Sequence, residues 1–305
     1  MSETIKGYSY TKCQSATATL NVLLNTVLDN AGINDQTGKR KHRCDILVLG
    51  YGDSVTPLLG TVEEPLALPD LPRHSLGRQI MHIARRDPVT RLLSTEEVTG
   101  PYWIKEVADS KRTETGKAIA KAYEAVGRWL LADNTRKDTR PAPVIINITD
   151  AQDNGSENPV QKAIELRQLS TTDGHALFFN CHLGTTGTDG LTFPATLNQV
   201  DDLFELALQH IAPTLPMGTI TRSSQPTEDE KQLRLEQICA RQLFEMSSPM
   251  PDIMLRNARR TFGLQIEAGA RGFIYNADAQ DLINFLEWGS LQDRFITTAS
   301  REEVG

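Results

Sequence analysis

The sequence predicts an α/β fold, a doubly wound and mostly parallel sheet with helices on both faces. Short apolar runs at residues 44–50 (CDILVLG), 144–148 (VIINI) and 176–181 (ALFFNC) are typical of strands that are buried on both faces. Amphipathic helical patterns separate these runs, so strands and helices alternate along the chain. The composition, 39% hydrophobic and 23% charged over 305 residues, is that of a globular protein.

The expected helices follow from apolar residues that recur at helical spacing. The first covers residues 11–31 and stops at Gly32, and the second covers residues 113–132. Asn158 and Pro159 predict the cap and the first position of a third helix. Further helices are expected at residues 200–211, 226–246, 252–262 and 279–288, and a last strand at residues 272–276.

Residues 1–290 are predicted to form one domain, and residues 291–305 a flexible tail. Two regions inside the domain resemble insertions. Residues 60–112 are punctuated by prolines and have a short strand expected at 101–107, and residues 184–226 are rich in Gly, Thr and Pro.

The net charge of -7 argues against nucleic acid or an anionic membrane surface as a partner. The dense basic run at residues 39–43 is interpreted as a solvated loop. No apolar stretch reaches membrane-spanning length, and the N-terminus lacks a signal-peptide pattern. The cysteines at positions 13, 44, 181 and 239 show no paired spacing, which predicts reduced thiols and a cytoplasmic location.

Asp150 directly follows the apolar run at 144–148 and opens a polar loop. In open α/β sheets, ligands bind at the carboxyl ends of the strands, so Asp150 is a candidate binding residue. An aspartate in this position is also a common turn former or helix cap. Asp153, in the same loop, is either an outer acceptor or a solvated acid.

Two other sites are considered and disfavoured. Gly50 and Gly52 begin a dinucleotide-type pattern, but Val55 stands where the next glycine belongs and Pro57 where a helix should begin. A strand-end turn is the better interpretation.

A zinc site would have to combine Asp173, His175, Cys181 and His182. Cys181 and His182 are adjacent on a strand, where neighbouring side chains point to opposite faces, and their spacing fits no common zinc pattern. No GxSxG context supports nucleophilic catalysis.

Four stretches together resemble bacterial von Willebrand factor A domain proteins of the tellurium-resistance and stress-operon type. They read VIINITDAQDNG, ALFFNCHL, FEMSSPMPDIM and EAGARGFIYNADAQDLINFLEWG, and the similarity extends from about residue 11 to residue 289. The resemblance implies a doubly wound sheet with a metal-ion-dependent adhesion site at its carboxyl edge. It also implies a binding module that is not an enzyme.

In that family the metal, Mg²⁺, is held by a DxSxS motif, a threonine and an aspartate. The resemblance places the aspartate at Asp150 and the threonine at Thr113, with Thr115 as the neighbouring alternative. Ala151 replaces the glycine that usually follows the aspartate. No DxSxS precedes the first helix, and Met1 is expected to match the methionine that ends that motif. The first strand and three ligands are then missing from this chain; the alternative is a genuine short form with a degenerate site.

The implied function is capture of a partner carboxylate, an Asp or Glu that completes the metal's coordination shell. The implied partners are a protein phosphatase or kinase of the same operon. The alternatives are a metal-free interaction module of the same fold and a metal-dependent hydrolase that uses Asp150, Asp153, His175 and His182.

Overall fold

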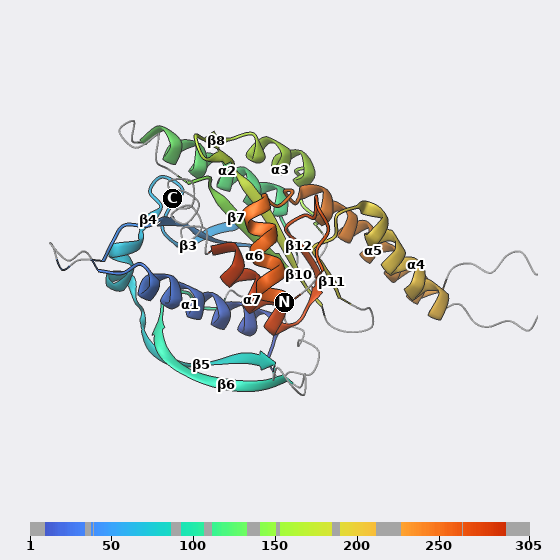
Figure 1. Cartoon of the computed structure of the whole chain (residues 1–305), viewed down its shortest axis with the longest axis horizontal. Helices are drawn as coiled ribbons and strands as arrows, with labels where there is room; N and C mark the ends of the chain where they lie inside the picture. Colours follow the sequence, from blue (N-terminus) through green and yellow to red (C-terminus); the bar gives the residue numbers. More distant parts are fainter. Residues whose placement is uncertain are drawn as a thin grey trace, which may run out of the picture.

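The computed structural model describes residues 10–33, 38, 40–86, 93–106, 112–132, 141–150, 153–184, 190–211, 227–263 and 265–290. In this part the chain is mixed α/β, with a small mixed sheet flanked by helices (Figure 1). The strand order is β11-β12-β10-β7. β7 (Val144–Thr149), β10 (Leu177–Leu183) and β12 (Phe273–Ala277) are parallel, and β11 (Leu191–Thr192) runs antiparallel to β12. The three predicted strands at 144–148, 176–181 and 272–276 are therefore confirmed.

Alternate residues of β10 enter two different hydrophobic clusters, which is why both faces of the sheet need helices. Phe179, Cys181 and Leu183 pack on one face, whereas Phe178 packs on the other. The first face is covered by α1 (Lys12–Asn30), α6 (Asp252–Phe262) and α7 (Ala279–Ser290). The second face is covered by α2 (Thr115–Ala132), α3 (Pro159–Arg167), α4 (Leu197–Ile211) and α5 (Glu228–Met246).

The predicted helices are all present in the described part of the chain, and local capping explains most of their ends. Thr11 and Gln14 form a capping box at the start of α1, with bonds of 3.0 and 3.1 Å between side chain and backbone. The Asn158 side chain accepts the backbone N–H of Val160 at 3.0 Å, which confirms it as the cap of α3. Gly263, at φ 65°, ends α6 in the left-handed conformation.

The expected strand at 44–50 does not join the parallel sheet, and this correction matters for the site. The segment is divided into β1 (Asp45–Ile46) and β2 (Val48–Tyr51). β1 pairs with β4 (Leu66–Ala67), and β2 pairs with β3 (Val55–Leu59), both antiparallel. The turn at residues 52–54, closed by a 3.0 Å bond between Gly52 N and Ser54 O, reverses the chain immediately. An apolar run predicts burial but does not choose the strand's partner.

Much of the region that looked like an insertion is a long antiparallel hairpin. After the 3-10 helix η1 (Leu68–His74), β5 (Gly77–Arg86) pairs with β6 (Leu93–Tyr102), and the ribbon passes alongside α1 (Figure 1). Met81 and Ile83 are buried, whereas Ile80 is 57% exposed. Of the strand expected at 101–107, only residues 101 and 102 belong to β6; residues 103–106 are not in a strand, and residue 107 lies outside the described residues.

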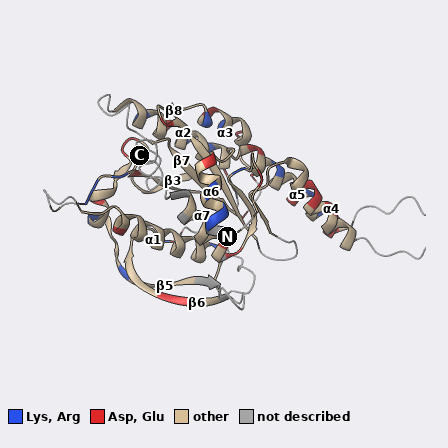
Figure 2. Ribbon diagram, viewed as in Figure 1, with Lys and Arg blue, Asp and Glu red and all other residues tan. Residues whose placement is uncertain are grey.

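A second short hairpin precedes β10: β8 (Ser170–Thr171) pairs with β9 (Gly174–His175). Residues 212–226 of the other expected insertion and the predicted tail at 291–305 lie outside the described residues. Acidic and basic residues are interspersed along the ribbon of the described chain (Figure 2).

Candidate functional site at the carboxyl edge of the sheet

Asp150 lies where the sequence placed it, immediately after the last residue of β7. Thr149, the last residue of β7, pairs with His182 of β10, so His182 lies at the same edge of the sheet as Asp150. The first residue of α1, Lys12, brings its ammonium group to the same edge, 3.9 Å from Asp150 Oδ2. The two side chains are only 3% and 12% exposed, so this charge pair is largely shielded from water. The sequence pattern gave no sign of Lys12, because α1 is distant from β7 along the chain.

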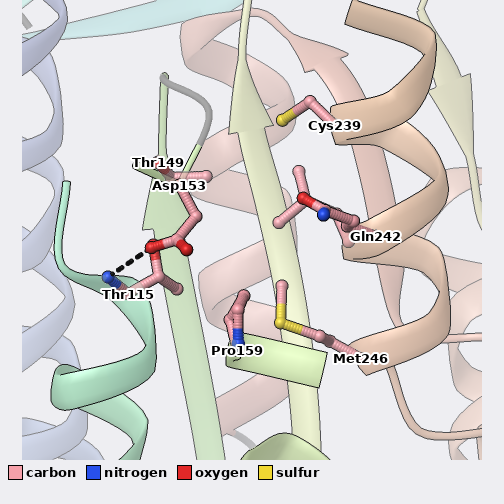
Figure 3. Close-up of a pocket in the computed structure, with 8 residues that line it drawn as sticks. Thr115, Thr149, Asp153, Pro159, Cys239, Gln242 and Met246 are labelled. Carbon is pink, nitrogen blue, oxygen red and sulfur yellow. Dashed lines mark hydrogen bonds between the residues drawn. The ribbon is translucent and has the colours of Figure 1, made fainter. Parts of the chain in front are cut away.

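Of the two candidate threonines, the structure brings Thr115 and not Thr113 into the pocket near this edge. Thr115, 4% exposed, opens α2, and its N–H donates to Asp153 Oδ1 at 2.9 Å (Figure 3). Thr113 is bonded through its backbone to Asn154: its N–H donates to Asn154 Oδ1 at 2.7 Å, and its carbonyl accepts from Asn154 N at 3.3 Å. Thr113 therefore fastens the loop after β7 to the start of α2.

Glu114, which no sequence motif marks as functional, strengthens the same junction. Its carboxylate accepts from Ser156 N at 3.2 Å and lies 3.2 Å from the Lys117 ammonium, and the side chain is 3% exposed. The Ser156 hydrogen bond, followed by that to Lys117, lowers the pKa of Glu114 from its ordinary value. A Cβ on Gly116 would lie 2.4 Å from the Glu157 carbonyl oxygen, so only glycine permits this approach. The loop is thus fixed against α2.

A shallow pocket of about 10 Å³, with room for little more than one water molecule, lies between this junction and α5 (Figure 3). One wall is polar and carries Thr115, Thr149 and Asp153. The remaining lining residues are Pro159, Cys239, Gln242, Leu243 and Met246. From the sequence, Asp153 was either an outer acceptor of a metal site or a solvated acid. The structure places it in the wall of a pocket, bonded to the backbone of Thr115.

A buried chain of hydrogen bonds crosses the sheet beneath the edge. The Tyr51 hydroxyl donates to Asn147 Oδ1 at 2.6 Å, and Asn147 Nδ2 donates to Asn180 Oδ1 at 2.9 Å. Asn180 Nδ2 then donates to Ser247 Oγ at 2.9 Å. Burial raises the pKa of Tyr51 to about 12, so its hydroxyl keeps its proton and remains a donor at neutral pH.

His182 reaches the same edge but is poorly suited to proton transfer or to zinc binding. Its ring stacks on Tyr275 at 4.5 Å, and its Nδ1 is buried without a hydrogen-bond partner in the described structure. Burial, with a smaller contribution from Lys12, lowers its pKa to about 4. Cys181 faces the opposite hydrophobic cluster, as the strand alternation predicts.

The remaining members of the hydrolase and zinc sets lie at the other end of the sheet. His175 belongs to β9, which precedes the first residue of β10. The Asp173 carboxylate accepts from Ala142 N at 3.2 Å, just before β7 begins. A strand rises about 3.3 Å per residue, so the length of β10 separates these groups from Asp150 and His182. The structure does not bring either set together.

The oxygens at the carboxyl edge are of the kind that Mg²⁺ prefers, namely hydroxyls and a small number of carboxylates. Asp150, Thr115, Thr149 and Asp153 offer such oxygens. Among the described residues, no group of three or more His, Cys, Asp or Glu side chains is arranged to hold a metal. Because Lys12 already lies beside Asp150, a metal on that carboxylate would have to compete with the ammonium group.

Comparison of the chain with models of protein families, with curated proteins and with solved structures found no match. In the described residues, no helix combines the length and the apolar character that crossing a membrane requires. Function must therefore be argued from the site and from the resemblance of sequence motifs.

Proposed function

We propose that the chain is a protein-binding module of the von Willebrand factor A type, which is not an enzyme and captures a partner carboxylate at the carboxyl edge of its sheet. The observation that carries the proposal is the position of Asp150 at the end of β7, beside a loop that is fastened to the first turn of α2. This arrangement supports the motif resemblance, because the edge holds oxygen ligands on separate loops and rigid elements.

Mg²⁺ is the proposed bridging ion, held by Asp150 and by a threonine hydroxyl. When bound, the ion would supply an open coordination position for an Asp or Glu of the partner. Thr115 is better placed than Thr113, because its side chain lines the pocket with Thr149. When the ion is absent, the Lys12 ammonium balances the charge of the Asp150 carboxylate, so the affinity of the site for metal is low. The alternative form of the same proposal is a module that binds its partner without metal.

The proposed setting is the bacterial cytoplasm, in a stress or phospho-signalling complex with a protein phosphatase or kinase. This setting rests on the motif resemblance alone. The hydrolase alternative is less well supported, because His175 lies at the opposite end of the sheet from Asp150 and His182 is buried against Tyr275.

The test uses Mn²⁺ as a paramagnetic substitute for Mg²⁺ and immobilised peptides that contain Asp or Glu. We expect Asp150→Ala to abolish Mn²⁺ binding in electron paramagnetic resonance and to remove Mg²⁺-dependent peptide capture. Asp173→Ala, at the amino end of the sheet, is the matched control and should bind as the wild type does. Peptides with Asn and Gln should not be captured. Equal capture by the wild type and by Asp150→Ala would reject the proposal.

A further inference from the structure

Two arginine side chains meet at the amino end of the sheet, on the side away from Asp150. Arg167, the last residue of α3, donates from Nη1 to the Ser247 carbonyl oxygen at 2.9 Å. Arg271, just before β12, donates from its own Nη1 to the same oxygen at 2.7 Å. Ser247 follows the last residue of α5, so three elements converge here. A carbonyl oxygen accepts two bonds, and the pair of Nη1 groups therefore satisfies it fully.

The backbone around Ser247 holds this cluster in place. Ser248 N donates to Phe178 O at 2.8 Å, and Gly272 N donates to Ser248 O at 3.0 Å, so the segment after α5 is tied to β10 and to the residue that precedes β12. The Arg271 guanidinium also lies 4.8 Å from the centre of the Phe244 ring. Stacking on a ring restricts the orientation of the guanidinium and leaves its edge available for hydrogen bonds.

Neither arginine forms an ion pair with a carboxylate in the described part of the chain. Their hydrogen bonds there go only to backbone carbonyls, of Ser247 for both and of Glu245 at 3.4 Å for Arg167. The Nε and Nη2 groups of both side chains have no acceptor among the described residues. The Glu245 side chain is exposed; its charge raises the pKa of Arg271 but is outweighed by burial, which lowers it.

Two positive charges held side by side are unfavourable without a counter-ion. Burial, and then the charge of Arg271, lowers the pKa of Arg167 from its ordinary value. One guanidinium would be enough to cap the carbonyls at the end of α5. The second guanidinium adds repulsion, but it also brings further N–H donors to the same carbonyl oxygen.

We propose that Arg167 and Arg271 form a binding site for a phosphate dianion, with the Ser247 carbonyl as the anchor that holds the two guanidinium groups together. A tetrahedral dianion matches two positive charges and can accept from the Nε and Nη2 groups of both forks. The phosphate belongs either to a free ion or to a phosphorylated side chain of another protein. The site is independent of the carboxyl-edge site, because it lies at the other end of the strands.

The first experiment titrates the full chain with inorganic phosphate and, separately, with a phosphoserine peptide and its unphosphorylated form, by calorimetry at low ionic strength. We expect saturable binding of phosphate that Arg167→Gln and Arg271→Gln each weaken by about tenfold. Arg241→Gln is the matched control, since Arg241 is already paired with Asp201 at 3.1 Å, and it should bind as the wild type does. Glu245→Gln should bind phosphate more tightly, because it removes the nearby negative charge.

Tighter binding of the phosphopeptide than of phosphate would assign the site to a phosphorylated protein, and equal binding would assign it to the free ion. Arg167→Lys and Arg271→Lys keep the charge and the fold but lose the fork, and they should bind severalfold more weakly. The proposal is overturned if the wild type binds neither probe, or if the double Arg→Gln variant, shown to be folded by circular dichroism, binds as well as the wild type.

Discussion

Asn147 and Asn180 face each other across β7 and β10, and the Nδ2 group of Asn147 donates to Asn180 Oδ1 at 2.9 Å. Asn180 is fully buried, and Asn147 is 7% exposed. This pair links Tyr51, the last residue of β2, to Ser247, the anchor of the two arginines. Polar groups buried at the centre of a sheet are tolerated only when they are bonded in this way.

Replacing Asn180 by alanine should therefore destabilise the fold strongly. The change leaves the Asn147 amide without its acceptor and also removes the bonds to Ser247 Oγ and to the Leu243 carbonyl. We expect the free energy of unfolding to fall by about 3 kcal/mol, measured by urea denaturation. Gln161→Ala removes an exposed bond to Glu165 and is expected to change it by no more than about 0.5 kcal/mol. Equal effects of the two substitutions would contradict the proposed role of the pair.

The depressed pKa of His182 predicts that stability is lost on acidification. In the unfolded chain His182 takes up a proton near its ordinary pKa of 6.5, whereas in the fold it does so only near 4. Between these values the unfolded state binds more protons, so the free energy of unfolding falls as the pH falls from about 6.5 to about 4. Each pKa unit corresponds to roughly 1.4 kcal/mol, so the shift from 6.5 to about 4 gives a loss of about 3.5 kcal/mol.

Urea denaturation of the wild type and of His182→Phe across this pH range checks the prediction. Phenylalanine keeps the stacking on Tyr275 and cannot take up a proton. The variant should show a shallower loss of stability than the wild type, and parallel curves for the two proteins would show that His182 is not responsible. Lys12 and Asp150, the charged groups that act on His182, are present in both proteins.

Removing the ammonium group of Lys12 should strengthen metal binding at Asp150. Lys12→Met keeps much of the buried aliphatic stem but leaves the carboxylate without the cation that lies 3.9 Å away. We expect the affinity for Mn²⁺ to rise by about tenfold, because one repelling charge is lost from a shielded site. In the presence of a chelator the variant should unfold at a lower temperature than the wild type, and added Mn²⁺ should restore it.

Lys162→Met is the matched control for this prediction, since Lys162 pairs with Glu165 on the surface of α3. It should leave the affinity for Mn²⁺ unchanged. If Lys12→Met binds Mn²⁺ no better than the wild type, the ammonium group does not compete with metal at this edge.

The four cysteines should differ sharply in reactivity. Burial raises the pKa of Cys239 to about 12, and burial also raises the pKa of Cys181. Cys13 and Cys44 are partly exposed. Since the thiolate is the reactive form, iodoacetamide at pH 8 should label Cys13 and Cys44 in the native protein well before the other two. Peptide mass spectrometry measures the labelling, and labelling in urea is the control. Early labelling of Cys239 would contradict its buried position on α5.

Local patterns were enough to place most regular elements. The helix at residues 252–262 and the strands at 144–148, 176–181 and 272–276 were predicted within a few residues, because caps and apolar periodicity are written into neighbouring residues. The alternation of Cys181 and His182 between two faces was predicted for the same reason. Asp150 at the end of a strand also followed from the order of residues alone.

The tertiary structure determined which strands and side chains that are far apart in the chain lie next to one another. It paired β1 with β4 and β2 with β3 rather than with β7, formed the hairpin of β5 and β6, and placed Thr115 rather than Thr113 at the pocket. It also brought Lys12 to Asp150 and Arg167 to Arg271. Strand partners and ion pairs depend on contacts between residues far apart in the chain, which local periodicity does not encode. The charge balance of both sites is therefore a property of the folded chain, whereas the elements that carry them are a property of the sequence.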